Sequence, residues 1–373
     1  MKKNIPNVVL LVLLAAIIAF FSLSYIFTPS STFSEDENRA LQGPPRLTLE
    51  KLIDGTYTRQ LHDYFSDQIA LRTVMIRLKA STELALGKNE NNGVLLGKDG
   101  YLIEVHSYTE ENYSYLKRNL AKIEKLMDTF SENGVKVNSA IIPRKIDLLE
   151  SKLPPYYSYE RNVDIWNLVG KKHINLTDTL LAWQNQDARV FYKTDHHWTA
   201  DGAYYAYVAL GKSVGYAPDP FNLHALDTLS NEFYGTSYSK SGFFFASPDT
   251  IYAPHVKEGK YLTTIVDIGH EMDGLYDVDY LSKKDKYSVF LSGNNAHVII
   301  TDVENPEKEK LLLIKDSFSH SLAPYLIKHY NIELIDPRYF AGSIEEYVVE
   351  SNIKNVLFIF GLDTLASANI SIR

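Results

Sequence analysis

Two uninterrupted apolar runs in the C-terminal half of the chain constrain its fold more than any other feature. They occupy residues 311–314 (Leu-Leu-Leu-Ile) and 356–360 (Val-Leu-Phe-Ile-Phe). A strand with apolar side chains on both faces must be covered on both faces, which is typical of parallel sheets flanked by helices. Further strands are expected at 135–142, 174–176, 190–192 and 331–335, and helices at 47–85, 111–132 and 179–184. The sequence therefore predicts an α/β domain with a parallel sheet covered by helices.

The N-terminus carries a segment that is long and apolar enough to cross a membrane. Residues 8–27 contain no charged side chain, and about 20 such residues span the hydrocarbon core of a bilayer. Lys2 and Lys3 precede the segment and three acids follow it at 35–37, which favours a cytoplasmic N-terminus. No small-residue cleavage site follows, so we expect an uncleaved single-pass anchor in the cell membrane with the bulk of the chain extracytoplasmic. A cleaved signal peptide is the alternative.

The pattern along the chain predicts three parts. Residues 1–28 form the membrane anchor, 29–90 a tether and helical lead-in, and 91–373 the α/β domain. Asn-Asn-Gly and Lys-Asp-Gly between residues 91 and 102 signal a hairpin at the start of that domain. Residues 235–287 are rich in Gly, Ser, Tyr and Asp and hold no long apolar run, so we expect a loop-rich insertion that covers a cleft.

Composition excludes several classes of function. The net charge of −8 argues against a nucleic-acid-binding surface. The absence of cysteine excludes a disulfide scaffold and thiolate chemistry. The 26 tyrosines suit stacking on sugars, although many will be ordinary core and surface residues.

A carboxylate and an imidazole lie two residues apart in Thr-Asp-His-His-Trp at 194–198, after an expected strand. On an extended segment Asp195 and His197 point to the same side, so Asp195 can orient His197 as a base while His196 faces away. We expect Trp198 to form a wall of the pocket. Histidines with purely structural hydrogen bonds are the alternative. A metal site is a third reading, which the lack of further ligands nearby disfavours.

A hydroxyl stands at the turn after the apolar run at 311–314. We expect Ser317 to point into the cleft as a nucleophile, with backbone N–H groups of the following helix stabilising an oxyanion. The alternative is a helix-capping serine. Ser237, in Gly-Thr-Ser-Tyr-Ser at 235–239, is a second candidate, although no apolar strand precedes it.

Other polar residues follow expected strands at the same edge of the sheet. Arg144 and Lys145 come after 135–142, and Arg338 and Tyr339 come after 331–335. These side chains are candidates for binding substrate or stabilising an oxyanion. The alternative is a structural role, for example a pair between Arg338 and Asp336.

The block at 194–199 with Asp-Gly-Ala at 201–203 resembles the signature of the DHHW family, which is itself similar to the SGNH-hydrolase-like proteins of alginate O-acetylation. Smaller pieces agree, among them Glu-Asn-Arg at 37–39 and the later Asp67 and Arg72. The resemblance implies an extracytoplasmic SGNH-hydrolase-like α/β fold. It also implies Asp195 as orienter, His197 as base and Ser317 as nucleophile. Lys315 departs from the small residue that usually precedes Asp-Ser in SGNH hydrolases.

Together these features predict an extracytoplasmic O-acyltransferase that acetylates a cell-envelope or secreted polysaccharide through an acyl-serine intermediate. No cofactor or metal is expected. Because acyl-CoA is made inside the cell, the resemblance also implies a membrane-embedded, acyl-exporting partner protein. The alternatives are a carbohydrate esterase with the same triad and a non-catalytic polysaccharide-binding assembly protein.

Overall fold

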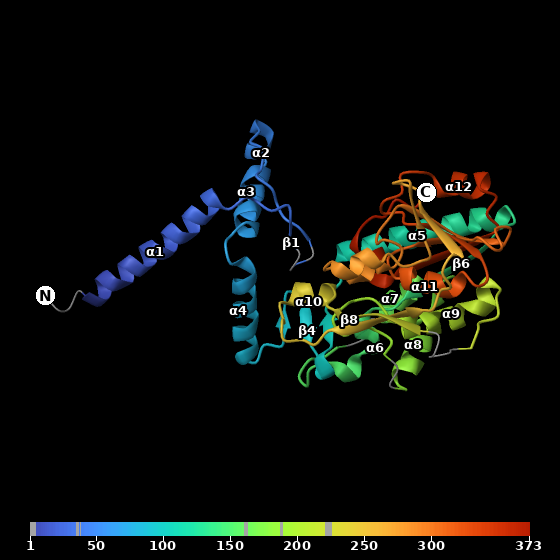
Figure 1. The fold of residues 1–373 in the computed structure, drawn as a ribbon, viewed down its shortest axis with the longest axis horizontal. Helices are drawn as coiled ribbons and strands as arrows, with labels where there is room; N and C mark the ends of the chain where they lie inside the picture. Colours follow the sequence, from blue (N-terminus) through green and yellow to red (C-terminus); the bar gives the residue numbers. More distant parts are fainter. Residues whose placement is uncertain (1–4, 35–36, 38, 160–162, 187–188, 221–225) are drawn as a thin grey trace. The chain divides into compact units, whose positions relative to one another are not determined.

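The computed structural model describes residues 5–34, 37, 39–159, 163–186, 189–220 and 226–373, and Figure 1 traces the chain. Lys2, Lys3, Glu35, Asp36 and Asn38 lie outside the described residues. The chain separates into two compact units, residues 1–88 with 242–244, and residues 89–241 with 245–373.

The N-terminal unit begins with the helix α1 (Ile5–Phe27), whose length and composition are compatible with a single-pass membrane anchor. Two short paired strands follow, β1 (Phe33–Ser34) and β2 (Arg39–Ala40). The expected helical region at 47–85 consists of three helices, α2 (Leu49–Ile53), α3 (Thr56–Asp67) and α4 (Arg72–Ala85). Gly55 and Leu71 separate them, each with a left-handed backbone that a continuous helix cannot contain.

Four charged residues that the family resemblance picks out form one cluster in this unit. Arg39 binds Glu37 at 2.9 Å and Asp67 at 2.5 Å, and Arg72 binds Glu37 at 2.6 Å. The cluster joins the segment after α1 to α3 and α4.

The larger unit is built on an eight-stranded mixed sheet. Its order is β11 (His270–Asp273), β10 (Tyr261–Ile265), β12 (His297–Asp302), β14 (Asn331–Ile335), β13 (Lys310–Lys315), β15 (Asn355–Gly361), β6 (Lys136–Ile142) and β7 (Ile174–Asn175). The strands from β14 to β7 are parallel to one another, whereas β12, β10 and β11 continue the sheet in antiparallel fashion. The predicted helix-covered parallel sheet is therefore confirmed, and the antiparallel edge is an addition to it.

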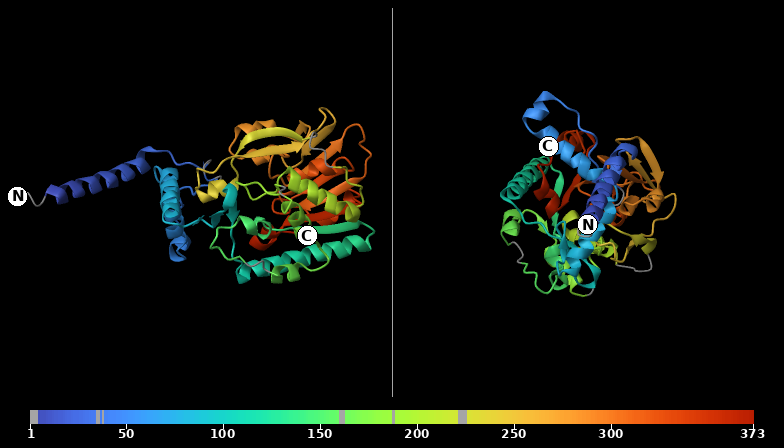
Figure 2. Two further views of the ribbon diagram at one scale, coloured as in Figure 1. Left: turned by 90° about the horizontal axis from the view of Figure 1, so that it is seen from below. Right: turned by 90° about the vertical axis from the view of Figure 1, so that its left-hand side faces the viewer.

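The apolar runs fill both faces of this sheet, as their lack of alternation predicts. In β13, Leu311 and Leu313 belong to one buried cluster and Leu312 and Ile314 to another, because successive side chains of a strand point to opposite faces. The first cluster includes α8 (Thr177–Gln184), α9 (Ala200–Val214) and α11 (Ser319–Leu326). The second includes α5 (Glu110–Glu132), α7 (Val163–Val169), α12 (Ile344–Glu350) and α13 (Leu362–Ser367). Figure 2 shows the long helix α5 running alongside the sheet.

The expected hairpin at 91–102 is present as the small sheet of β3 (Glu90–Asn91), β4 (Val94–Leu96) and β5 (Leu102–Glu104). Short helical segments complete the unit: η2 (Lys98–Gly100), α6 (Lys145–Leu148), η3 (Glu150–Lys152), η5 (Val278–Ser282) and η6 (Lys286–Val289).

The strand predicted at 190–192 is wrong. Phe191 makes only an isolated antiparallel bridge with Trp198, and Val190 accepts a hydrogen bond from the backbone N–H of Thr199 at 2.9 Å. Residues 190–199 therefore form a loop closed on itself, not a strand of the sheet. Val190 and Phe191 are nevertheless fully buried, and this burial explains the apolar pattern.

The segment at 235–287 is more regular than the expected loop-rich insertion. It contains α10 (Thr236–Ser241) and β9 (Asp249–Pro254), which pairs with β8 (Leu226–Phe233), and it supplies β10 and β11 to the main sheet. In β10 alternate residues are buried, Tyr261, Thr263 and Ile265. This one-sided burial produces no continuous apolar run, which is why composition indicated loops.

Candidate active site

Ser317 lies in the turn between β13 and α11, at the carboxyl end of a central strand. Asp316 shapes this turn: its carboxylate accepts hydrogen bonds from the backbone N–H of Phe318 at 3.1 Å and of Gly361 at 2.7 Å. Every residue from 311 to 327 is buried except Ser317. The turn therefore presents one side chain, the Ser317 hydroxyl, at the surface of an otherwise closed core.

Asp195 lies on the closed loop at 190–199, and buried groups on other elements hold this loop in place. The ammonium group of Lys145 donates to the backbone carbonyls of Leu102, Lys193 and Asp195 at 2.6, 2.9 and 3.0 Å. Burial lowers the pKa of Lys145 to about 8. Lys145 was expected to bind substrate or an oxyanion, but in this structure its three bonds are to backbone carbonyls, two in the loop and one in β5, and they join the loop to that strand.

The loop and the turn place three side chains in hydrogen-bonding order. Nε2 of His197 lies 2.7 Å from Oγ of Ser317, and Nδ1 of His197 lies 2.6 Å from Oδ1 of Asp195. Asp195 also accepts from the backbone N–H groups of His197 and Thr236 at 2.9 and 2.8 Å. Burial by itself raises the pKa of Asp195, but the neighbouring imidazoles and these hydrogen bonds hold it well below its ordinary value. The carboxylate is therefore ionised and can stabilise a positive charge on His197.

Aromatic rings fix the orientation of the His197 imidazole. The ring of Tyr287 stacks on it with centroids 4.0 Å apart and planes 9° apart, and Phe318 approaches it edge-on at 5.0 Å. The Tyr287 hydroxyl bonds to Ser321 at 3.1 Å, so this ring is itself held in place. Sequence reasoning missed Tyr287, which comes from the segment expected to be loop.

Gly235 and Thr236 support the far side of Asp195. The Thr236 hydroxyl donates to Oδ2 of Asp195 at 3.0 Å. A Cβ atom on Gly235 would lie 2.2 Å from the Asp195 Cβ, so only glycine fits. The sequence pattern favoured a loop lining the cleft here, with Ser237 as a candidate site residue. The hydroxyl of Ser237 is fully buried and bonds to Glu104 at 2.9 Å.

Trp198 does not form the expected pocket wall. It is fully buried, and its indole N–H donates to the carbonyl of Phe318 at 3.0 Å and to the hydroxyl of Ser321 at 2.9 Å. The next residue, Thr199, caps α9, because its hydroxyl accepts from the backbone N–H of Gly202 at 3.3 Å.

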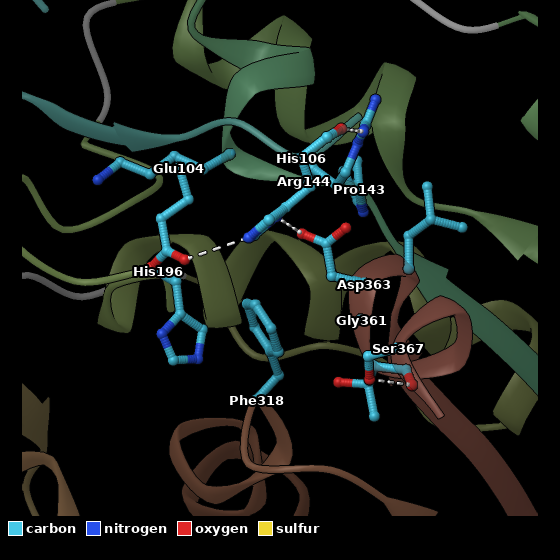
Figure 3. Close-up of a pocket in the computed structure, with 12 residues that line it drawn as sticks. Glu104, His106, Pro143, Arg144, His196, Phe318, Gly361, Asp363 and Ser367 are labelled. Carbon is cyan, nitrogen blue, oxygen red and sulfur yellow. Dashed lines mark hydrogen bonds and ion pairs between the residues drawn. The ribbon is translucent and has the colours of Figure 1, made fainter. Parts of the chain in front are cut away.

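Ser317, His197 and Asp195 are called the triad below. A pocket of about 240 Å³ adjoins the triad, and Figure 3 shows its lining. His196 and Phe318, the chain neighbours of His197 and Ser317, line it together with Pro143 and Arg144. The remaining lining residues are Glu104, His106, Lys145, Gly361, Leu362, Asp363, Thr364 and Ser367. Arg144 and Lys145, both predicted as substrate-binding cations, border this space. Arg144 is bonded to Asp147 at 3.0 Å and to Tyr159 at 2.7 Å.

Arg338 and Tyr339 do not line this pocket. Arg338 binds the buried carboxylate of Asp336 at 2.7 Å, which is the structural pairing considered from the sequence, and Tyr339 is exposed. Asp336 also lies 3.4 Å from the ammonium group of Lys315, which is buried and bonds to His320 at 2.8 Å. Lys315 therefore points into the core below the turn and leaves the surface around Ser317 open.

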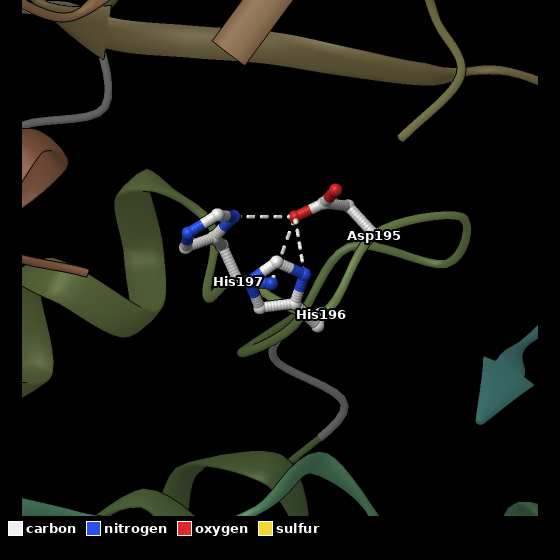
Figure 4. A group of neighbouring side chains, drawn as sticks. All are labelled: Asp195, His196 and His197. Atoms are coloured by element: carbon white, nitrogen blue, oxygen red, sulfur yellow. Dashed lines mark hydrogen bonds and ion pairs between the residues drawn. The ribbon is translucent and has the colours of Figure 1, made fainter. Parts of the chain in front are cut away.

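His196 does not face away from Asp195 as the extended-segment argument predicted. Its ring lies against that of His197, with centroids 3.9 Å apart, because residues 193–197 bend instead of extending. Figure 4 shows Asp195, His196 and His197 gathered together, with candidate ligand atoms within 4.8 Å of one another. Such a group can hold a metal ion, but an ion there would have to displace the bond between Asp195 and His197.

A free backbone donor is available at Ser317. The N–H groups of Phe318, Ser319, His320 and Gly361 are already hydrogen-bonded. Among the described residues, the N–H of Ser317 has no hydrogen-bond partner. It is therefore a candidate donor for an oxyanion at this turn.

Comparison with known proteins agrees with this architecture. The profile of the family described as "DHHW protein" matches residues 141–335, which is more than half of the chain. The chain belongs to the DHHW family.

Solved structures of similar fold come from two bacteria. A DHHW family protein from Eubacterium siraeum aligns with a TM-score of 0.59 and 22% identity, over 75% of this chain and 94% of that one. Bacillus cereus PatB1, solved with a sulfonyl adduct, aligns with a TM-score of 0.57 and 20% identity, over 74% and 96%. The predicted SGNH-hydrolase-like α/β fold is therefore confirmed.

Curated relatives carry the name "Probable alginate O-acetylase AlgJ". The protein of that name from Pseudomonas syringae pv. tomato is 26% identical over 196 residues, 48% of this chain and 49% of the relative. The Pseudomonas fluorescens protein is 25% identical over 177 residues, 44% of each chain. The matches thus span about half the length of these relatives.

Proposed function

We propose that this DHHW protein is an extracytoplasmic O-acyltransferase that moves an acetyl group onto a hydroxyl of a cell-envelope or secreted polysaccharide. The observation that carries the proposal is the continuous hydrogen-bonded order of Ser317, His197 and Asp195, at 2.7 and 2.6 Å. A hydroxyl, an imidazole and an ionised carboxylate in this order activate serine for acyl transfer. The name of the curated relatives supports acetyl as the group and polysaccharide as the acceptor.

In the proposed first step, His197 accepts the Ser317 proton while Oγ attacks the carbonyl carbon of the acyl donor. Asp195 stabilises the imidazolium, and the N–H of Ser317 donates to the oxyanion. The donor's leaving group departs with the proton from His197, and an acyl-serine ester remains. In the second step His197 removes a proton from a sugar hydroxyl, which attacks the ester carbonyl. Ser317 then leaves and recovers the proton from His197.

The anchor and the acyl donor follow from the same proposal. The apolar helix α1 would hold the catalytic unit at the outer face of the membrane. Acyl-CoA is made inside the cell, so a membrane-embedded, acyl-exporting partner protein would deliver the group.

The test replaces the nucleophile and a matched serine two positions later. Ser317→Ala should abolish labelling by a fluorophosphonate probe and acetylation of envelope polysaccharide in cells. Ser319→Ala should retain both, because the Ser319 hydroxyl is buried and without a hydrogen-bond partner in the described structure. Normal polysaccharide acetylation in a folded Ser317→Ala variant would refute the proposal and leave a binding or assembly role.

The carbohydrate esterase differs from this proposal only in the acceptor, water in place of a sugar. Incubation of the full chain with p-nitrophenyl acetate and a soluble oligosaccharide separates the two functions. A transferase yields acetylated sugar, whereas an esterase yields acetate alone and removes acetyl groups from an acetylated polymer.

A further inference from the structure

The imidazole of His196 borders the pocket beside the triad and has no task in the acyl transfer described above. Its side chain is 38% exposed, and Figure 3 shows the ring at the pocket next to Phe318. Because its ring lies against that of His197, at 3.9 Å between centroids, a molecule that approaches the proposed base also approaches His196.

The hydrogen bonds around Thr236 determine which nitrogen of His196 carries the proton. The Thr236 hydroxyl donates its single proton to Oδ2 of Asp195 at 3.0 Å, because an ionised carboxylate can only accept. Nδ1 of His196 lies 2.6 Å from the same hydroxyl oxygen. That oxygen can therefore only accept from His196, and the proton of the neutral ring must be on Nδ1. Asp195 thus orients both imidazoles, His197 directly and His196 through Thr236.

The second nitrogen of His196, Nε2, is left with a lone pair. Within the described part of the chain, Nε2 has no hydrogen-bond partner. It does not belong to the buried, unpaired polar atoms, so solvent or a ligand can reach it. Burial lowers the pKa of His196, and the neighbouring His197 imidazole lowers it further, so the neutral ring is favoured. The pocket therefore contains a fixed hydrogen-bond acceptor next to the proposed base.

The charges of the pocket wall indicate what kind of molecule this acceptor meets. Glu104 accepts from Lys240 and Ser237, both at 2.9 Å, and Asp363 accepts from the Tyr108 hydroxyl at 2.6 Å. The cation Arg144 is paired with Asp147. Since these charged groups already have partners, the pocket suits an uncharged molecule that offers hydroxyl groups more than an ion.

From this geometry we infer that His196 is a binding residue for the acyl acceptor, and that its Nε2 accepts a hydrogen bond from a hydroxyl group of an uncharged sugar. The inference rests on the proposed function and adds the acceptor class and the residue that selects it. A sugar ring carries neighbouring hydroxyls, so one can bond His196 while another attacks the acyl-serine. Water lacks this second hydroxyl, and His196 thereby favours transfer over hydrolysis. No covalent bond is made or broken at His196.

Two substitutions distinguish the roles of the two nitrogens of the His196 ring. The amide nitrogen of His196→Asn matches Nδ1 and can still donate to Thr236, but nothing replaces Nε2. The longer His196→Gln brings an amide oxygen to the position of Nε2 and loses the bond to Thr236. The pair distinguishes a binding role from a structural one.

The experiment uses the full chain in detergent, p-nitrophenyl acetate as donor and methyl glucopyranoside as acceptor. Release of p-nitrophenol in a single turnover reports acyl-serine formation, and the ratio of acetylated glucoside to acetate at completion reports the choice of acceptor. His196→Asn should release p-nitrophenol within about twofold of wild type and lower the ratio about tenfold, the effect of one lost hydrogen bond. His196→Gln should keep the ratio within about threefold.

Two outcomes would overturn the inference alone: an unchanged ratio in His196→Asn, or a loss of p-nitrophenol release in His196→Asn equal to that in Ser317→Ala. The last outcome would make His196 a structural support of the triad. Failure of the proposed function gives different results: wild type would form acetate without acetylated glucoside, or Ser317→Ala would release p-nitrophenol as fast as wild type.

Discussion

The indole N–H of Trp198 donates a hydrogen bond to the backbone carbonyl of Phe318 at 3.0 Å, across 120 positions of sequence. Trp198 directly follows the proposed base, and Phe318 directly follows the proposed nucleophile. The bond therefore connects the loop at 190–199 to the turn after β13 at the place where His197 meets Ser317. A buried hydrogen bond between two segments fixes their spacing, because leaving the indole N–H or the carbonyl unpaired in the core is costly.

Replacing this tryptophan should loosen the triad. Trp198→Phe keeps an aromatic ring but removes the bonds to Phe318 and Ser321, and we expect a loss of about 1–3 kcal/mol in the free energy of unfolding. Acyl-serine formation should fall about tenfold, measured as p-nitrophenol release. Trp183→Phe is the matched control, since Trp183 is partly exposed and stacks on Tyr205 at 4.1 Å. Equal effects of the two changes would count against the link.

The glycine behind the carboxylate should not tolerate a methyl group. In Gly235→Ala the new Cβ would lie 2.2 Å from Cβ and 2.3 Å from Oδ2 of Asp195, so the carboxylate must move. We expect acyl-serine formation to fall at least 100-fold, because small displacements of a catalytic group cost rates of this order. Gly43→Ala is the control, since no atom lies within 4 Å of its added Cβ. Near-normal activity in Gly235→Ala would show that this contact does not constrain Asp195.

Asp195→Asn should reduce turnover more than binding. The amide cannot stabilise an imidazolium, and it can turn the His197 ring to the wrong tautomer, so we expect a loss of about 10³- to 10⁴-fold in acyl-serine formation. Single-turnover release of p-nitrophenol measures this step. A loss below tenfold would mean that His197 works without its carboxylate.

The same variant should also change how stability depends on pH. The pKa of Asp195 in the folded protein lies well below its ordinary value, so the unfolded chain binds the proton more readily. The carboxylate therefore contributes stability above about pH 4, and this contribution is lost as the pH falls. Urea unfolding between pH 6 and pH 3 should show a smaller fall in the free energy of unfolding for Asp195→Asn than for the wild type. Parallel curves would contradict the prediction.

Lys315 should be required for stability despite its unusual place before the turn. Its buried ammonium group lies between His320 and Asp336, and Lys315→Met would remove one partner of a buried carboxylate. We expect a loss of about 2 kcal/mol or more in the free energy of unfolding, since removing one partner of a buried ion pair is destabilising. Lys328→Met removes an exposed pair with Asp219 and should cost less than about 1 kcal/mol. Thermal unfolding of both variants tests the difference.

Much of the fold could be predicted because burial on two faces leaves a mark in the sequence. Residues 311–314 and 356–360 are apolar at every position, and each became a central strand with one hydrophobic cluster on either side. The strands β10 and β12 were not predicted, because each mixes polar and apolar residues and neither contains an apolar run of four residues. Phe191 was wrongly predicted to lie in a strand. Its apolar side chain reflects its burial in the core, which a loop residue can share with a strand residue.

The sequence alone identified Asp195, His197 and Ser317 as candidates for the acid, base and nucleophile of an acyl-transfer site. It also pointed to the family through the block at 194–199. Only the tertiary structure could show that the three side chains meet, that Tyr287 stacks on the base and that Thr236 joins His196 to Asp195. Apart from the bond between His197 and Asp195, these contacts join residues 40 to 120 positions apart along the chain. Local patterns record burial and backbone preference, whereas a contact between distant residues depends on how the elements pack, and no short stretch of sequence contains that information.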